Sequence, residues 1–400
     1  PIKEAIALQL FGGVSKVLPD GMKIRGESNI LLVGDPGTAK SQLLQYVAQI
    51  APRGLYTSGK GSSAAGLTAA VIRDESGGMS LEAGALVLAD QGIACVDEFD
   101  KMRPEDRSAL HEAMEQRSIS IAKAGIVATL NARTSILAAA NPALGRYNPY
   151  RTPAENINLP VTLLSRFDLL FVLQDRPDRE RDERISDHIL NLHRKKSVQP
   201  PIEADLLKKY IMYARRNVHP ILSEAAAKKI KEFYLEMRSA GEGGDAPVPI
   251  TARQLEALVR LTEARARMAL RNEATVDDAE AVINLMKYSL RQVGVDRDTG
   301  KFDIDTIMVG RSKSQRDKLE ILVDIIKELG EELGGEGVPT EKVIETAEKQ
   351  GLDKGFIIRA IENLKNEIGK ARDVNFVLGF IGGLISAGIP ALAYLKFRKK

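Results

Sequence analysis

A short apolar run that leads into a glycine-containing loop ending in Lys-Ser constrains the fold of this chain more than any other feature. Residues 29–33 are Asn-Ile-Leu-Leu-Val, and the loop that follows consists of Gly34, Asp35, Pro36, Gly37, Thr38, Ala39, Lys40 and Ser41. The pattern predicts a buried strand, a loop whose backbone N–H groups surround phosphate, and a helix whose positive end faces that phosphate. We expect a nucleotide site in which Lys40 reaches the terminal phosphates and Ser41 holds Mg²⁺. Ala39 stands where the usual motif has its last glycine.

The composition excludes some classes of protein. The 400 residues are enough for more than one domain with a real core. A net charge of only +3 gives no global attraction to nucleic acid, so any such contact needs a local patch. The single cysteine, Cys95, lies in an apolar run, which excludes an intrachain disulfide and favours a buried thiol in a reducing compartment.

Further apolar runs predict strands at residues 55–57, 93–96, 135–140 and 169–173, and residues 2–17 have apolar positions at helical spacing. Strands that alternate with helices indicate a parallel sheet covered on both faces, with the phosphate loop at its carboxyl edge. We therefore predict an α/β P-loop core over residues 1–199.

Two adjacent acids, Asp97 and Glu98, follow the apolar run at 93–96. Asp97 suits a magnesium ligand beside Ser41, and Glu98 suits a base that polarises the attacking water. Solvated acids at the end of a strand are the alternative. The presence of Lys40 and Ser41 upstream favours the nucleotide site.

Two later polar residues are further candidates. Asn141 follows the run at 135–140 and could orient the attacking water, although an Asx turn before Pro142 is the alternative. Arg166 precedes the run at 169–173. An arginine supplied to the γ-phosphate by a neighbouring subunit is a recurring means of stabilising the transition state.

Period-two alternation over residues 117–127 is interrupted at 123–125, which predicts a β-hairpin with Lys123 at its tip. Such a hairpin could contact a nucleic-acid backbone in a central channel, whereas an ordinary surface hairpin is the alternative. Residues 59–78, rich in small side chains and followed by a predicted helix at 81–89, suggest a second projecting element.

From residue 200 the pattern becomes entirely helical, with predicted helices at 202–217, 223–241, 251–270 and 275–293. We expect a helical lid over 200–294. Arg253 lies in the first turn of the third helix, after a capping-box pattern that begins at Thr251. A cation there opposes the helix dipole, which suggests a ligand-facing role, and a solvated surface arginine is the alternative.

A polar linker is predicted at 295–312, and a small domain at 313–372 with helices at 314–333, 340–350 and 354–367. The short turn between the last two resembles a helix-turn-helix of winged-helix type. Acidic side chains slightly outnumber basic ones here, so we favour a regulatory or protein-contacting role over DNA reading.

The tail, residues 373–400, does not fit this organisation. Residues 374–395 include no charged side chain and are followed by a basic cluster, a length and flank sufficient for a transmembrane helix. Pro390 and several glycines weaken a helix. A membrane anchor, a buried hairpin and foreign sequence from a fusion remain open, and we do not favour a membrane role because the rest is typical of a soluble motor.

Four stretches together resemble the MCM (minichromosome maintenance) replicative helicases of the AAA+ class, in their archaeal form. They are residues 34–41, 96–102, 139–142 and 165–168. Alanine at position 39 is usual in that family. The resemblance implies an AAA+ fold with a helical lid and a C-terminal winged-helix-like domain, and it implies that the family's N-terminal DNA-binding domains lie outside this sequence.

The resemblance also implies roles for the candidate residues. Those expected to act on the nucleotide of their own subunit are Lys40, Ser41, Asp97, Glu98 and Asn141. Arg166 and Arg253 are expected to act on the neighbour's nucleotide, so the working unit would be a homo-oligomeric ring, expected to be a hexamer.

Lys123 matches the hairpin lysine that grips DNA in this family. ATP and Mg²⁺ are the implied cofactors, and a single DNA strand held in the central channel, mostly through its backbone, is the implied partner. Other replication proteins are further candidate partners. The expected location is the cytoplasm at the nucleoid, or the nucleus in a eukaryote.

Two other functions are alternatives to this one. A different AAA+ motor with a similar hairpin, such as a metal-chelatase subunit, would hydrolyse ATP without stimulation by DNA. A nucleotide-binding scaffold would hold the nucleotide without hydrolysing it, so Glu98→Gln would change nothing.

Overall fold

The structure is a computed structural model. It describes residues 1–60, 64–73, 79–123, 126–143, 145–148, 156–157, 159–175, 177–194, 200–239, 250–293, 313–332, 339–358 and 360–361. The chain divides into two compact units, Pro1–Ser312 and Lys313–Lys400. The predicted linker at 295–312 and the tail at 373–400 lie outside the described residues, and the finer boundaries at 199, 294 and 372 stay predictions.

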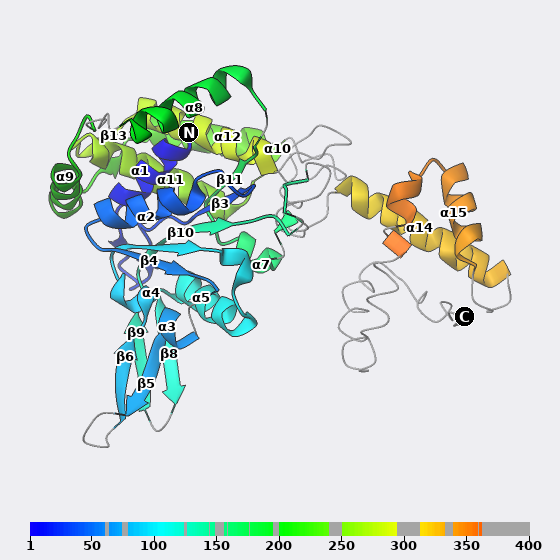
Figure 1. Cartoon of the computed structure of the whole chain (residues 1–400), viewed down its shortest axis with the longest axis horizontal. Helices are drawn as coiled ribbons and strands as arrows, with labels where there is room; N and C mark the ends of the chain where they lie inside the picture. Colours follow the sequence, from blue (N-terminus) through cyan, green and yellow to red (C-terminus); the bar gives the residue numbers. More distant parts are fainter. Residues whose placement is uncertain are drawn as a thin grey trace. The chain divides into compact units, whose positions relative to one another are not determined.

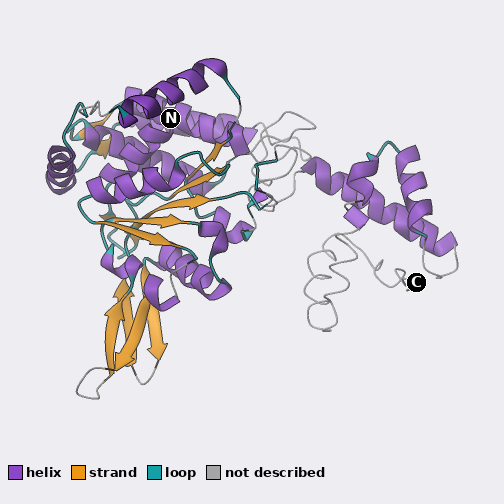
Figure 2. Cartoon of the chain, viewed as in Figure 1, coloured by secondary structure: helices purple, strands orange, loops and turns teal. Residues whose placement is uncertain are grey.

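A five-stranded parallel sheet forms the centre of the first unit (Figures 1 and 2). Its strands are β3 (Ile30–Gly34), β4 (Gly54–Ser58), β7 (Ile93–Asp97), β10 (Ser135–Ala140) and β11 (Leu169–Leu173). They lie in the order β11-β3-β10-β7-β4, and every neighbouring pair is parallel. All five strands were predicted from the sequence, and the P-loop α/β fold is confirmed.

Most positions of β3, β7, β10 and β11 are apolar because both faces of the sheet are covered, whereas β4, at one edge, is only partly buried and includes Thr57 and Ser58. In β3, Ile30 and Leu32 belong to one buried cluster, while Leu31 and Val33 belong to a second cluster on the other face. Cys95 in β7 is also fully buried, as expected, and burial raises the pKa of its thiol to about 12.

Helices cover the two faces. The first buried cluster includes residues of α1 (Ile2–Phe11) and α2 (Lys40–Ile50). The second cluster includes residues of α4 (Ala85–Leu88), α5 (Pro104–Gln116) and α7 (Val161–Leu164). The helical pattern predicted over 2–17 extends only to Phe11, because Gly12 adopts a φ of 65° and ends the helix. Strands β1 (Lys16–Val17) and β2 (Lys23–Ile24) then form a short antiparallel pair.

Two antiparallel hairpins extend from one end of the core in the view of Figure 1. Strands β8 (Ser118–Lys123) and β9 (Ile126–Asn131) form the predicted hairpin, and Lys123 pairs with Ile126 just before the turn. The second hairpin consists of β5 (Ala69–Arg73) and β6 (Met79–Ala83), after the short helix α3 (Ala64–Leu67). The helix predicted at 81–89 is confirmed only over α4 (85–88), and its first three residues are wrong, because residues 79–83 pair as a strand.

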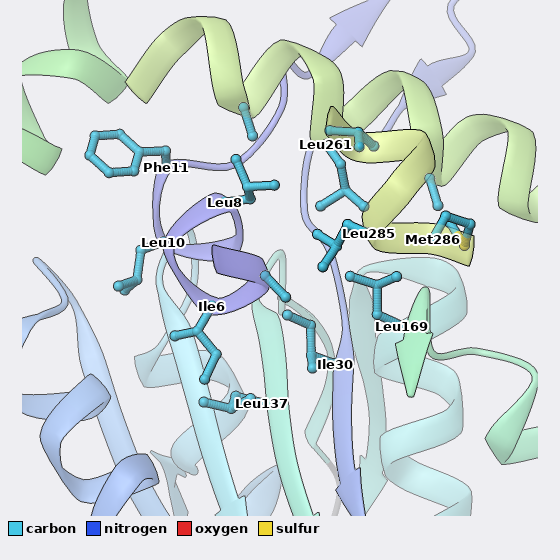
Figure 3. Close-up of a cluster of buried hydrophobic side chains, with 14 of the residues drawn as sticks. Ile6, Leu8, Leu10, Phe11, Ile30, Leu137, Leu169, Leu261, Leu285 and Met286 are labelled. Carbon is cyan, nitrogen blue, oxygen red and sulfur yellow. The ribbon is translucent and has the colours of Figure 1, made fainter. Parts of the chain in front are cut away.

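The helices predicted for the lid are α9 (Ala204–Asn217), α10 (Glu224–Ser239), α11 (Ala252–Met268) and α12 (Val276–Val293), and α8 (Arg179–His193) precedes them. Helices α11 and α12 contribute Leu261, Leu285 and Met286 to the same cluster as the sheet and α1 (Figure 3). Strands β12 (Ile221–Leu222) and β13 (Glu273–Ala274) form a small parallel pair.

Helix α12 also protects the edge of the sheet. Strand β11 is an edge strand, and an unpaired edge invites association with another chain. The Ser289 hydroxyl exchanges hydrogen bonds with the backbone of Leu170, and the Gln292 amide oxygen accepts one from the N–H of Val172. The last lid helix is thereby fixed to the strand beside the phosphate loop.

The second unit has its own small core. Helix α14 (Lys313–Glu332) packs against α15 (Thr340–Lys349) through residues that include Leu322 and Val343. Gly351, with φ 86°, turns the chain into a further helical stretch at 354–358. The predicted helix-turn-helix is present, and a winged helix stays a prediction because residues 362–400 are outside the described part.

Among the described residues, no helix combines the length and the apolar character needed to cross a membrane. The apolar stretch at 374–395, on which that question depends, lies outside them.

Candidate nucleotide site

The phosphate loop connects the carboxyl end of β3 to the first turn of α2. A Cβ on Gly34 would lie 2.5 Å from the carbonyl oxygen of Leu173, so only glycine fits beside β11. Gly37 and Ala39 have φ values of 84° and 59°. Alanine in this left-handed region costs roughly 1–2 kcal/mol, which explains why glycine is usual at the last position of the motif. A Cβ on Gly37 would meet nothing within 4 Å, so the loop borders open space.

The Lys40 ammonium lies inside the loop. It donates hydrogen bonds to the carbonyl oxygens of Gly34 and Asp35, at 2.7 and 2.8 Å, and to the Thr38 hydroxyl at 3.2 Å. Burial lowers the pKa of Lys40, and the negative charges of Asp35, Asp97 and Asp100 oppose that shift. The lysine and the predicted magnesium ligand therefore belong to one electrostatic group.

The two acids at the end of β7 have different surroundings. Asp97 is buried and accepts hydrogen bonds from the Tyr56 hydroxyl at 2.9 Å and from the N–H of Glu98. Glu98 has a φ of 48° and accepts a hydrogen bond from Ser58 at 3.2 Å, while Lys101 forms a short contact with its other oxygen. Lys101 and Ser58 lower the pKa of Glu98 against the effect of burial.

Asn141 lies at the same edge of the sheet. Strand β10 lies between β3 and β7, with Ala140 opposite Val33 and Ala138 opposite Val96. The N–H of Asn141 donates to a carboxylate oxygen of Asp100 at 2.9 Å. The structure therefore brings the phosphate loop, the two acids and Asn141 together.

Arg166 lies at the opposite edge. It precedes β11, and its carbonyl oxygen accepts a hydrogen bond from the side chain of Asn29, the residue before β3. Because β3 and β11 are parallel and in register, the amino ends of both strands lie together. Asn29 and Asp35 are six positions apart along extended chain, a span of about 20 Å. Arg166 is thus a strand length away from the phosphate loop of its own chain.

Arg253 lies beside Arg166. It is in the first turn of α11, where the predicted capping box of Thr251 and Gln254 is present. Its guanidinium donates to the carbonyl oxygen of Ser165. Burial and then the charge of Arg166 lower the pKa of Arg253. The two arginines, 87 positions apart in sequence, form one cationic group.

Three contacts at these edges had no signal in the sequence. Tyr56 orients the Asp97 carboxylate, Asn29 joins the amino ends of three strands, and Glu115 on α5 pairs with Arg166 at 2.7 Å. Asp35 belongs to the predicted phosphate loop, and its carboxylate accepts hydrogen bonds from two backbone N–H groups. Each contact joins segments distant along the chain, so no local pattern announces it.

The family comparisons cover both parts of the first unit. A family model described as the MCM P-loop domain matches residues 1–193, and one described as the MCM AAA-lid domain matches residues 205–290. Together they include every residue of the two edges described above.

Individual relatives give the same result. A minichromosome maintenance protein of Saccharolobus solfataricus is 52% identical over 366 residues, which are 91% of this chain and 53% of the relative. The DNA replication licensing factor MCM4 of Arabidopsis thaliana is 47% identical, and the matched residues are 88% of this chain and 42% of the relative. The DNA replication licensing factor MCM5 of the same plant is 46% identical, over 90% of this chain and 50% of the relative. The chain spans about half the length of these relatives or less.

Proposed function

Because the chain belongs to the MCM family, we propose that it is the motor portion of a ring-shaped DNA helicase that hydrolyses ATP and uses the energy to move along DNA. The ring would be a homo-oligomer, which we expect to be a hexamer. It would act at the nucleoid, or in the nucleus if the source is eukaryotic. The matches do not favour the metal-chelatase or scaffold alternatives.

One observation supports the proposal most directly, and it is the separation of the two groups of residues. The phosphate loop and Glu98 lie at the carboxyl edge of the sheet, whereas Arg166 and Arg253 lie at the amino edge. An arginine side chain is much shorter than the strand between them. A second copy that presents its amino edge to the first copy's loop would complete a site that one chain leaves incomplete.

The residues at the carboxyl edge suit the chemistry. Lys40 would exchange its bonds to the loop's own carbonyl groups for bonds to the β- and γ-phosphates. Glu98 would polarise the attacking water after giving up its contact with Lys101, and Asn141 would orient that water. These groups act on the substrate of their own subunit.

The oxygen donors Ser41 and Asp97 are of the kind that Mg²⁺ prefers, and Asp97 is already held by Tyr56. The ion, when bound there, would neutralise phosphate charge. At the other subunit, Arg166 and Arg253 would stabilise the charge that develops on the γ-phosphate.

DNA would contact the hairpin of β8 and β9, and the second hairpin of β5 and β6 extends from the same end of the core in Figure 1. We expect Lys123, at the last strand pair before the turn, to contact the phosphate backbone of a single strand. Hydrolysis that moves this hairpin would move the strand.

Mixing two inactive variants tests the shared site. Arg166→Ala and Glu98→Gln chains should each be inactive, because each lacks one half of the site. In mixed assemblies, some interfaces combine the intact Glu98 of one variant with the intact Arg166 of the other, so ATPase activity should reappear. Absence of recovery, in mixtures shown by mass to co-assemble, would contradict sharing.

Stimulation by DNA tests the motor function. The ATPase rate of the wild-type chain should rise when single-stranded DNA is added. A rate that ignores DNA would favour the chelatase-like motor, and nucleotide binding without phosphate release in either condition would favour the scaffold.

A further inference from the structure

Asp35 forms hydrogen bonds through four polar groups, which are its backbone N–H, its carbonyl oxygen and its two carboxylate oxygens. Its N–H donates to the carbonyl oxygen of Leu173 at 3.0 Å, and its own carbonyl oxygen accepts from Lys40 and Thr38. One carboxylate oxygen accepts from the N–H of Tyr147 at 2.7 Å, and the other accepts from the N–H of Asp175 at 3.0 Å. The residue therefore joins the phosphate loop to two segments that are remote in sequence.

The chemistry of the contacts suits a permanent structural link. Asp35 is buried, at 7% exposure of the whole residue, and a buried carboxylate is tolerated only where donors satisfy both oxygens. Backbone N–H groups do so here without adding a competing cation. A carboxylate committed in this way is not a phosphate ligand, which its negative charge would oppose in any case.

The two segments held by Asp35 lead to different parts of the protein. Tyr147 follows Asn141 after the end of β10. Asp175 follows the end of β11 and precedes α8, which leads into the lid helices. Asp35 therefore links the phosphate loop directly to the chain beyond Asn141 and to the chain that enters the lid.

We propose that Asp35 is a positioning residue that transmits nucleotide occupancy of the phosphate loop to residues 145–148 and 174–175. The inference rests on the proposed function only in that the loop binds nucleotide. It goes further by assigning the coupling between the loop and the lid connection to one side chain that does not touch the nucleotide. Removing the carboxylate breaks both side-chain links and leaves only the backbone bond from the N–H of Asp35 to Leu173.

The wild-type chain provides the first test. Hydrogen exchange of the nucleotide-free protein should show slow exchange at the amides of Tyr147 and Asp175, and addition of Mg²⁺ with a non-hydrolysable ATP analogue should change exchange at both. Binding of a fluorescent ATP analogue, measured separately, reports whether the loop takes nucleotide at all. Failure of that binding would defeat the proposed function, whereas binding without any change in either segment would overturn the inference alone.

Variants provide the second test. Asp35→Asn keeps one acceptor oxygen and nearly the same shape, and Asp35→Ala removes both. Asp20→Asn is the matched control, because Asp20 also accepts a backbone N–H, from Met22, but at an exposed turn. We expect nucleotide affinity to fall about tenfold or more in Asp35→Ala and less in Asp35→Asn, since the first removes both charge-assisted hydrogen bonds that hold the loop and the second keeps one acceptor oxygen.

The decisive comparison is made at saturating nucleotide. The Asp35 variants should then bind nucleotide yet show no nucleotide-dependent change in exchange at 145–148 and 174–175. If Asp35 merely braces the loop, affinity would fall but the response of both segments would persist, which would overturn the proposal. Should Asp35→Ala not fold, as judged by thermal unfolding, Asp35→Asn and the wild-type exchange pattern decide the question.

Discussion

The Arg166 guanidinium lies 2.7 Å from the carboxylate of Glu115 on helix α5, within one chain. His111, one turn earlier on that helix, lies 3.3 Å from the same guanidinium group. The arginine lowers the pKa of Glu115 against the effect of burial. An arginine that we propose to act on a neighbouring subunit is thus held in place by its own subunit before any neighbour is present.

Replacing Glu115 with glutamine should impair the chemical step more than nucleotide binding. The charged partner that holds Arg166 would be removed, while the phosphate loop would be unchanged. Because Arg166 is expected to contact the γ-phosphate chiefly in the transition state, we expect kcat to fall about tenfold with little change in KM. Steady-state ATPase measurements on the assembled ring provide the test.

The matched control is Glu232→Gln, an exposed carboxylate that faces Lys228 across one helical turn of α10. It should leave kcat and KM unaltered. The Glu115 pair is itself partly exposed, so thermal unfolding should change little. A change confined to KM, or a full wild-type kcat, in the Glu115 variant would mean that Arg166 is positioned by other contacts.

Asp168 should make the stability of the chain depend on acid pH. Its side chain is fully buried between Arg25 at 2.9 Å and Arg260 at 2.7 Å, and it also accepts the N–H of Asn29. Burial alone would raise the pKa of Asp168, but the two arginines outweigh it and the pKa is lowered. The stabilisation is therefore complete above the unfolded-state pKa of about 3.9 and is lost as the pH falls through the lower folded-state pKa.

Asp168→Asn should destabilise the chain at pH 7 by about 3–5 kcal/mol, because it leaves Arg260 buried with only the exposed carboxylate of Glu256 as a counter-charge. Urea unfolding from pH 7 to pH 3 provides the measurement. The wild type should lose stability below about pH 4, and the variant should lose less over the same interval. Equal slopes for the two chains would remove Asp168 from the acid response.

The sequence predicted the sheet well because most of its strands are short apolar runs, a pattern that burial on both faces requires. It failed at residues 81–83, which were expected to begin a helix but belong to β6, paired with β5. The residues of the candidate site divide in the same way, into those that a local pattern predicts and those that it does not. Lys40, Asp97 and Glu98 follow local motifs, whereas Glu115 meets Arg166 and Tyr147 meets Asp35 only after the chain has folded.

Two small residues of the phosphate loop, Gly34 and Ala39, should respond in opposite ways to substitution. Gly34→Ala places a Cβ 2.5 Å from the carbonyl oxygen of Leu173, which should cost about 1–3 kcal/mol of unfolding free energy and weaken nucleotide binding. Ala39→Gly relieves a left-handed alanine, with a net gain below about 1 kcal/mol after the added freedom of the unfolded chain. Urea unfolding of both variants gives the comparison, and destabilisation by Ala39→Gly would contradict it.

Lys123→Ala should separate DNA contact from nucleotide contact. The backbone of Lys123 ends strand β8, at the last pair before the hairpin turn, and the phosphate loop follows β3 in the central sheet. We expect affinity for single-stranded DNA to fall, and its dependence on salt concentration to weaken by about one unit of slope for each phosphate that is no longer neutralised. DNA-stimulated ATPase activity should disappear while basal activity and affinity for nucleotide persist.

Lys228→Ala is the control for that experiment, since Lys228 is a highly exposed lysine of α10 outside the hairpins. Both chains have the same net charge, so a general loss of positive charge would weaken DNA binding equally in the two. A loss confined to Lys123→Ala would assign the contact to the hairpin. If the salt dependence and the stimulation by DNA are the same in both variants and the wild type, the strand does not pass along this hairpin.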